Sequence, residues 1–87
     1  MGKLLILLNY IFFVFSSDIK EQRRHIHVKD KKRGLKKFCK FWIEPDIQLE
    51  SNIGFSHSEL NEIEKMIHSN IKIIHRQSDS YFMRVKE

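Results

Sequence analysis

Apolar and polar residues alternate along two segments of the chain, and a period of two predicts β-strands. In residues 25–29 the apolar side chains of Ile26 and Val28 fall on one face. The other face of that strand carries polar side chains, those of His25, His27 and Lys29. Residues 38–43 alternate in the same way, and residues 47–50 fit a further short strand.

The first sixteen residues are the most apolar part of the chain. Residues 3–8 and 11–16 predict two buried strands joined by a tight turn at Asn9-Tyr10, because aromatic and β-branched residues favour strands and Asn tolerates turns. The cationic start and apolar run also resemble a secretory signal peptide. The run is too short to span a bilayer and lacks a convincing cleavage site, so we expect the hairpin and no membrane contact.

A long helix is predicted over residues 57–76, and its start is the strongest local signal in the sequence. Ser56 and Glu59 form a capping box, in which each side chain accepts a hydrogen bond from the other residue's backbone N–H. Apolar residues then recur at intervals of three and four, which places one stripe on the helix: Leu60, Ile63, Ile67, Ile71 and Ile74. The polar residues 78–80 predict a turn after it.

These elements predict an α+β fold, in which a small antiparallel β-meander of four to five strands precedes one long C-terminal α-helix packed on one face of the sheet. Eighty-seven residues supply one hydrophobic core, so residues 1–87 are expected to be a single domain. So small a core favours a partner or a homo-oligomer. The single cysteine excludes an internal disulfide, which favours a cytoplasmic protein over a secreted scaffold.

The net charge of +5 is unevenly distributed along the chain. Residues 20–40 hold ten Lys and Arg against two acidic residues, a local charge of +8, whereas residues 44–87 carry −3. The basic block and the aromatic residue beside it form a candidate binding surface over residues 23–42, made of Arg23, Arg24, Lys29, Lys31, Lys32, Arg33, Lys36, Lys37, Lys40 and Trp42.

Three interpretations of this basic block stay open at the level of sequence. Cations beside exposed rings are what single-stranded RNA or DNA requires, since the charges hold phosphates and the rings stack on bases. The same charges also suit docking to an acidic protein partner. They could equally be a solvated loop that keeps a sheet edge from pairing.

His25 and His27 are the candidate catalytic residues, because they project from the same face of one strand. Two imidazoles could act as acid and base on RNA, as in a metal-independent ribonuclease. A metal requires three or four ligands, Cys39 falls on the opposite face, and Glu44 is the best additional donor, so we assign neither a metal nor a cofactor. Alternatively, the two histidines are half-exposed and pack beside Phe38 and Trp42.

Four segments, in this order and spacing, resemble the bacterial domain of unknown function 4160 family: FVFSSD at 13–18, HIHV at 25–28, KFWIEP at 40–45 and GFSHSELNEIE at 54–64. The resemblance covers most of the chain and supports the N-terminal hairpin. Two prolines that usually precede the first histidine are Arg23 and Arg24 here.

The resemblance implies a biological context without an activity. Members of that family are often encoded beside a small partner protein, a domain of unknown function 2442, in an arrangement like that of toxin–antitoxin pairs. We therefore expect a small module of a two-gene system that binds RNA through the 23–42 surface. The alternative is a non-enzymatic protein that docks its small partner, and an enzyme activity is not required by either hypothesis.

Overall fold

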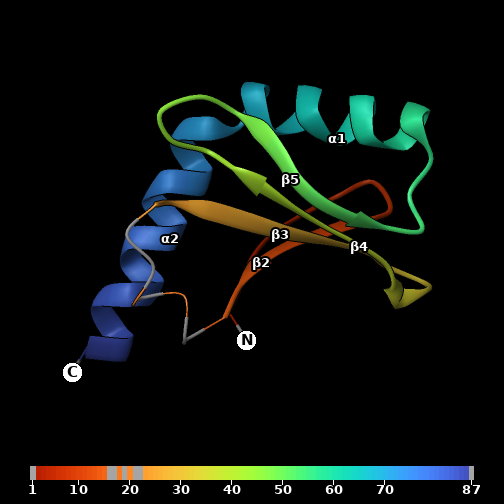
Figure 1. Cartoon of the computed structure of the whole chain (residues 1–87). Coiled ribbons are helices and arrows are strands. Elements are labelled where there is room, and N and C mark those ends of the chain that lie inside the picture. The colour runs from red at the N-terminus through yellow and green to blue at the C-terminus, as the bar shows by residue number, and fades with distance from the viewer. Residues whose placement is uncertain (1, 16–17, 19, 21–22, 87) are drawn as a thin grey trace.

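A computed structural model shows five antiparallel strands followed by two helices (Figure 1). It describes residues 2–15, 18, 20 and 23–86, with side chains as far as residue 84. The strands pair in chain order: β1 (Gly2–Leu7), β2 (Tyr10–Val14), β3 (His25–Asp30), β4 (Gly34–Trp42) and β5 (Gln48–Ile53). The helices are α1 (His57–Ser69) and α2 (Ile71–Lys86). The predicted α+β class and antiparallel meander are confirmed.

Strands β1 and β2 form the predicted N-terminal hairpin, with Gly2 opposite Val14 and Leu7 opposite Tyr10. Its turn lies one residue earlier than predicted, at Leu8 and Asn9, where Leu8 adopts a left-handed conformation with φ of 53°. The predicted end of the second strand, residue 16, lies outside the described residues.

The later strands are longer than the alternating pattern predicted. Strand β4 begins at residue 34 rather than 38, so part of the charged segment belongs to the sheet. Strand β5 extends to residue 53, and all six of its residues are exposed. This exposure explains why its apolar pattern was weak, because β5 is an edge strand that pairs only with β4 in the described part of the chain.

The prediction of one long helix is wrong, because the helix breaks at Asn70 between α1 and α2. Asn70 has φ −120° and ψ 17°, and its side-chain amide donates to the Met66 carbonyl at 2.8 Å. The backbone N–H of Asn70 donates to the same carbonyl at 3.0 Å, so the side chain adds a second bond where α1 ends. The apolar stripe crosses the break without a change of period, since Ile67 and Ile74 on either side are both buried in the same core.

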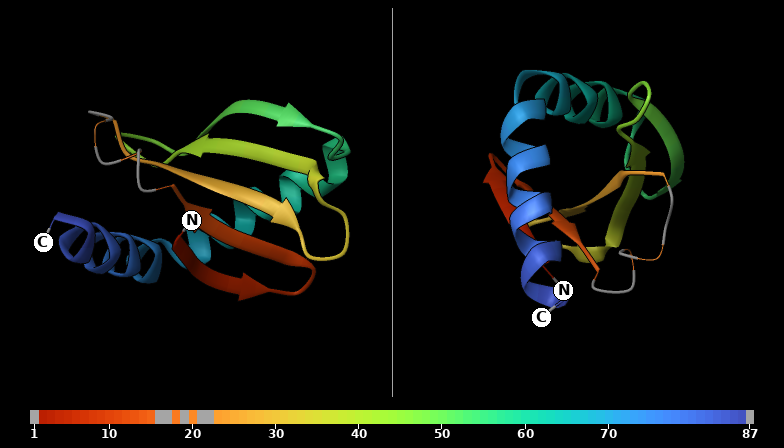
Figure 2. Two further views of the ribbon diagram at one scale, coloured as in Figure 1. Left: turned by 90° about the horizontal axis from the view of Figure 1, so that it is seen from below. Right: turned by 90° about the vertical axis from the view of Figure 1, so that its left-hand side faces the viewer.

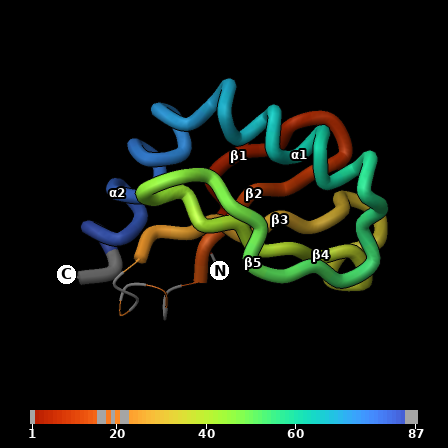
Figure 3. The backbone as a smooth tube through the Cα atoms, turned by 45° about the horizontal axis from the view of Figure 1, so that its top comes forward, coloured from red at the N-terminus to blue at the C-terminus, as the bar shows by residue number. Residues whose placement is uncertain are grey.

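The turn predicted at residues 78–80 is also absent, because α2 continues through it to Lys86. Ser78 is buried, and the ring of Tyr81 lies against Gly2 of β1. Packing along β1 therefore keeps a polar segment helical. The two helices run in clearly different directions (Figures 1 and 3). Within the described residues, no helix is long and apolar enough to cross a membrane.

The main core lies between the helices and one face of the sheet (Figure 2). The strands contribute alternate side chains to it, namely Tyr10, Phe12, Val14, Ile26, Val28, Cys39 and Phe41. The helices contribute Ile63, Ile67 and Ile74, which were predicted to share one stripe. The residues between these strand positions point to the other face of the sheet.

Candidate functional site

The face of the sheet opposite the helical core is called the open face here. Residues directly opposite in an antiparallel pair share a face, so the register defines its members. His27 lies opposite both Phe13 of β2 and Lys40 of β4, and His25 lies opposite Trp42. With the pair formed by Lys29 and Phe38, the central part of the open face includes Phe13, His25, His27, Lys29, Phe38, Lys40 and Trp42.

The two histidines of β3 lie side by side on the open face, as their spacing predicted. Their ring centroids are 5.0 Å apart. The ring of His27 lies nearly parallel to those of Phe13 and Phe38, at 5.5 Å and 5.4 Å, and these two rings also contact each other at 6.0 Å, so the three form one cluster. His25 meets the edge of Trp42 at 5.7 Å. Their packing beside Phe38 and Trp42 is confirmed, but the expected half-exposure is wrong. His25 and His27 are only 5% and 6% exposed, because aromatic neighbours cover them.

Asp18 joins the two histidines, although it precedes β3 by seven positions. One of its carboxylate oxygens lies 3.1 Å from Nε2 of His25, and the other lies 3.2 Å from Nε2 of His27. The second oxygen also accepts the backbone N–H of Phe15 at 2.7 Å. Sequence reasoning missed this residue, because no spacing rule links a residue before a strand to side chains within it. Its presence in the FVFSSD segment was the one available signal.

Hydrogen bonds to His25 define which of its ring nitrogens carries a proton. Nδ1 lies 3.2 Å from the carbonyl oxygen of Arg23, which can only accept, so Nδ1 is the donor. Nε2 of His25 is buried and makes no hydrogen bond to a described residue, since its 3.1 Å approach to Asp18 lacks hydrogen-bond alignment. The 3.1 Å approach is therefore a close contact between Nε2 and the carboxylate without a hydrogen bond.

Burial sets the charge state of His27. Removal from water lowers the pKa of the His27 imidazole, and this effect outweighs the opposing attraction of Asp18. The neighbouring His25 and Lys40 lower the same pKa further. A neutral His27 is thus favoured near pH 7. With so little ring edge exposed, the predicted acid and base roles of the two histidines have poor access to a phosphate in this conformation.

Trp42 and two cations form the outer part of the open face. The guanidinium carbon of Arg23 lies 4.5 Å from the centre of the indole ring, and Nζ of Lys40 lies 4.6 Å from it. Arg23 is held there by hydrogen bonds to the carbonyl of Glu44 at 2.7 Å and to the side chain of Gln48 at 2.9 Å. Lys29 lies over the ring of Phe13 at 5.3 Å. Each of these three cations therefore lies over an aromatic ring of the open face.

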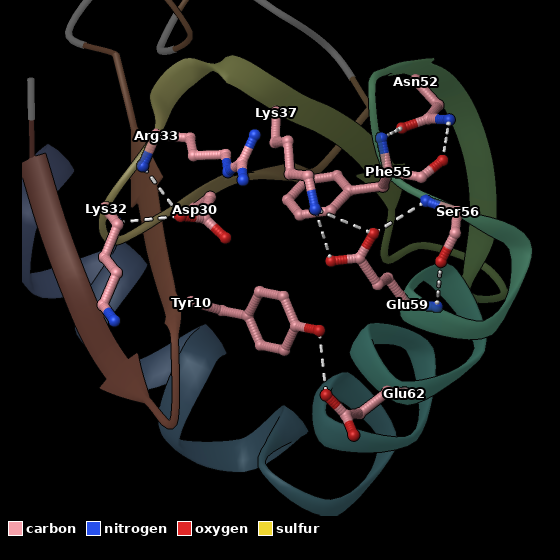
Figure 4. A network of polar contacts seen from close by, with 10 residues as sticks. All are labelled: Tyr10, Asp30, Lys32, Arg33, Lys37, Asn52, Phe55, Ser56, Glu59 and Glu62. Carbon is pink, nitrogen blue, oxygen red and sulfur yellow. Dashed lines mark hydrogen bonds and ion pairs between the residues drawn. The ribbon is translucent and has the colours of Figure 1, made fainter.

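Two residues of the predicted basic surface face the helices instead. Lys37 lies 2.9 Å and 3.1 Å from the two carboxylate oxygens of Glu59 at the start of α1 (Figure 4). Arg24 pairs with Asp79 of α2, lies 3.1 Å from Nδ1 of His75, and approaches Glu44 at 3.6 Å. Glu44 is thus engaged by arginines and is not part of the histidine cluster.

The remaining basic residues gather where β3 turns into β4 and are exposed: Lys31, Lys32, Arg33 and Lys36. Asp30 shapes this turn, since its carboxylate accepts the backbone N–H groups of Lys32 and Arg33 at 2.8 Å each (Figure 4). These bonds lower the pKa of Asp30. The predicted 23–42 surface is consequently divided into an open-face group, a turn group and a pair that binds the helices.

Cys39 is not placed to take part in chemistry on the open face. It is fully buried in the helical core, and burial raises the pKa of its thiol to about 12. A thiol with so high a pKa stays protonated and is a poor nucleophile. This confirms the predicted position of Cys39 on the face opposite the histidines.

Comparison with known proteins yields one family. Residues 9–77, from the first turn to the middle of α2, match the family described as Domain of unknown function (DUF4160). No curated protein and no solved structure matches the chain.

Proposed function

Because the chain belongs to the DUF4160 family, whose description states no activity, we propose from its own geometry that it binds single-stranded RNA on the open face of the sheet. The observation that carries the proposal is Trp42, whose ring lies within 4.6 Å of the charged groups of both Arg23 and Lys40. Single-stranded nucleic acids are held by such combinations of rings and cations.

The chemistry of the two cations supports this assignment. Arg23 is anchored by Glu44 and Gln48, so it offers a positioned charge beside the ring. Lys40 presents a compact ammonium charge beside the same ring, which suits contact with a phosphate. Stacking of one base on an aromatic ring contributes roughly 1–3 kcal/mol.

The exposed turn between β3 and β4 would extend the binding track. Its four cations, Lys31, Lys32, Arg33 and Lys36, carry no stacked ring among the described contacts and would act on the phosphates by charge alone. Contacts of this kind raise the association rate and are weakened by salt.

The single tryptophan of the chain makes a direct test available. Titration of the protein with a ten-nucleotide single-stranded RNA should quench the fluorescence of Trp42. A plot of the logarithm of the association constant against the logarithm of the salt concentration should have a negative slope of about 0.7 for each phosphate contacted. Lys40→Ala should weaken binding several-fold, whereas the matched control Lys65→Ala, an exposed lysine of α1, should not. Absence of binding at low salt, or an equal loss in both variants, would refute the proposal.

Cleavage of the bound RNA by His25 and His27 stays a separate prediction. Incubation of the same RNA with the protein, followed by product analysis, tests it. Cleavage that disappears when both residues are changed to Ala would support it, and intact RNA with the parent protein would exclude it.

A second candidate function, docking of a protein partner, is favoured by the edge strand β5. All of its residues are exposed, and they include Leu49 and Ile53 with exposed fractions of 44% and 60%. An exposed edge with apolar side chains can pair with a strand of another chain. Co-expression with the product of a neighbouring gene tests both docking and the two-gene arrangement. Co-purification that Ile53→Lys abolishes would support this candidate.

A further inference from the structure

We propose that Asp18, His25 and His27 form a binding site for a divalent transition-metal ion, with Zn²⁺ as the ion that best fits their donors. One ligand atom from each residue lies within 4.8 Å of the others. The sequence alone offered only two histidines and therefore no metal site; Asp18 supplies the third donor. This proposal is independent of RNA binding, because it concerns groups beneath the exposed surface.

The strongest observation is the orientation of the His25 ring. Its Nδ1 donates to the Arg23 carbonyl, so in the neutral ring Nε2 carries a lone pair. That lone pair lies 3.1 Å from a carboxylate oxygen of Asp18, which is also an acceptor. The contact lacks hydrogen-bond alignment, so no proton is shared between these two acceptors, and a cation bound by both would stabilise their approach. Nε2 of His25 is buried and has no hydrogen-bond partner in the described part of the chain, so its lone pair is available to a positive ion.

Two of the separations are close to those of tetrahedral zinc. Bonds of about 2.0–2.1 Å to nitrogen and oxygen place neighbouring ligand atoms roughly 3.3 Å apart in a tetrahedron. One Asp18 oxygen lies 3.1 Å from Nε2 of His25, and the other lies 3.2 Å from Nε2 of His27. With one ligand atom from each residue the separations extend up to 4.8 Å, so rotation of the side chains would have to bring the three donors together around the ion.

Two of the three donors have contacts of the kind found in an outer coordination shell. Metal-binding histidines commonly donate their second N–H to a carbonyl, as His25 does to Arg23. The carboxylate of Asp18 is likewise oriented by the N–H of Phe15. His27 differs, because its Nε2 is hydrogen-bonded to Asp18 and its buried Nδ1 has no partner among the described residues, so metal binding at Nε2 would transfer the ring proton to Nδ1. The aromatic rings of Phe13 and Phe38 pack against His27 and reduce its contact with bulk water, which strengthens charge interactions inside the site.

The charge of the three side chains favours a bound divalent ion. Bound to a metal, the Asp18 carboxylate would contribute one negative charge and the two imidazoles none, and the Asp18 side chain is only 11% exposed. A divalent cation bound there would offset the charge of the carboxylate. Three protein ligands leave a fourth position for water or an anion, which is the pattern of catalytic rather than structural zinc sites.

The site can be tested on the full chain. Bound metals are first removed with a chelator, and the protein is then titrated with Zn²⁺ in a calorimeter. We expect one ion per chain. Asp18→Asn and His25→Gln should each weaken binding by at least about tenfold, since loss of even an outer-shell partner costs about 10–100-fold. The matched control His68→Gln, an exposed histidine of α1, should bind like the parent chain. An unchanged affinity in Asp18→Asn and His25→Gln would overturn the proposal.

A measurement on the unmodified chain keeps the proposal testable if the variants do not fold. In nitrogen-15 spectra of the imidazoles, Zn²⁺ should shift Nε2 of His25 and His27 and leave His57 and His68 unchanged. Co²⁺ should give the intense visible absorption of a tetrahedral site, without the sulfur-to-metal band of a thiolate, because Cys39 lies on the other face. If His57 or His68 shifts instead, or if no ion binds, the site is wrong; a proton shared with Asp18 would then explain the cluster.

Discussion

Lys37 on β4 and Glu59 on α1 form an ion pair that ties the helix start to the sheet. The same Glu59 carboxylate accepts the backbone N–H of Ser56 at 2.9 Å, while the Ser56 hydroxyl accepts the N–H of Glu59 at 3.1 Å (Figure 4). A local helix cap and a tertiary contact therefore share one side chain. Both partners of the ion pair are about three-quarters buried, with side-chain exposures of 25% and 27%.

Glu59→Gln should lower the free energy of unfolding by about 1–2 kcal/mol, because it weakens both the cap and the charged contact with Lys37. Urea denaturation followed by circular dichroism measures the change. Glu64→Gln, on the same helix, is the matched control and should change stability by less than about 0.5 kcal/mol. Equal effects of the two substitutions would show that the shared carboxylate has no special role.

The contribution of Glu59 should depend on pH. The backbone N–H of Ser56, followed by the Lys37 ammonium, lowers the pKa of Glu59 below its ordinary value of 4.5. A carboxyl group whose pKa is lower in the folded state stabilises the fold above its unfolded pKa, and this contribution is lost as pH falls through the folded value. The stability difference between the parent chain and Glu59→Gln should therefore be full at pH 7 and shrink below pH 4.5. A constant difference down to pH 2 would contradict the assignment.

Gly54→Ala should destabilise the protein more than Gly34→Ala does. Both glycines have positive φ, 82° and 58°, where a β-carbon costs about 1–2 kcal/mol. At Gly54 that carbon would also meet the backbone oxygen of Lys36 at 2.5 Å, whereas Gly34 has nothing within 4 Å. Thermal unfolding of the two variants makes the comparison. A similar melting temperature for both would mean that the backbone near Lys36 yields easily.

Arg24→Gln should loosen the second half of α2. Arg24 contacts Asp79 and His75, so it links the start of β3 to a helix that otherwise packs chiefly along β1. Its side chain is 37% exposed, and exposed ion pairs contribute little to global stability. The expected effect is local: faster amide hydrogen exchange in residues 75–84, with little change in the denaturation midpoint. Arg76→Gln, an exposed arginine of α2, serves as the control.

The features that the sequence predicted correctly are those with short-range causes. The helix start at Ser56 depends on four consecutive residues, and the faces of β3 and β4 follow from the two-residue period of a strand. These determined that His25 and His27 share a face with Trp42. They also placed Cys39 in the core.

Tertiary structure decided the features that join distant or aperiodic segments. The break at Asn70 leaves the apolar stripe uninterrupted, so only packing of two differently directed helices on one core reveals it. The extension of α2 through residues 78–80 depends on contact with β1, and the division of the basic block depends on which acidic residues the helices bring to Arg24 and Lys37. Asp18 lies outside both β2 and β3, yet its carboxylate lies beside the two histidines of β3. A carboxylate that reaches a strand from outside it has no periodic signature in sequence, so only the tertiary structure placed the third donor of the proposed metal site.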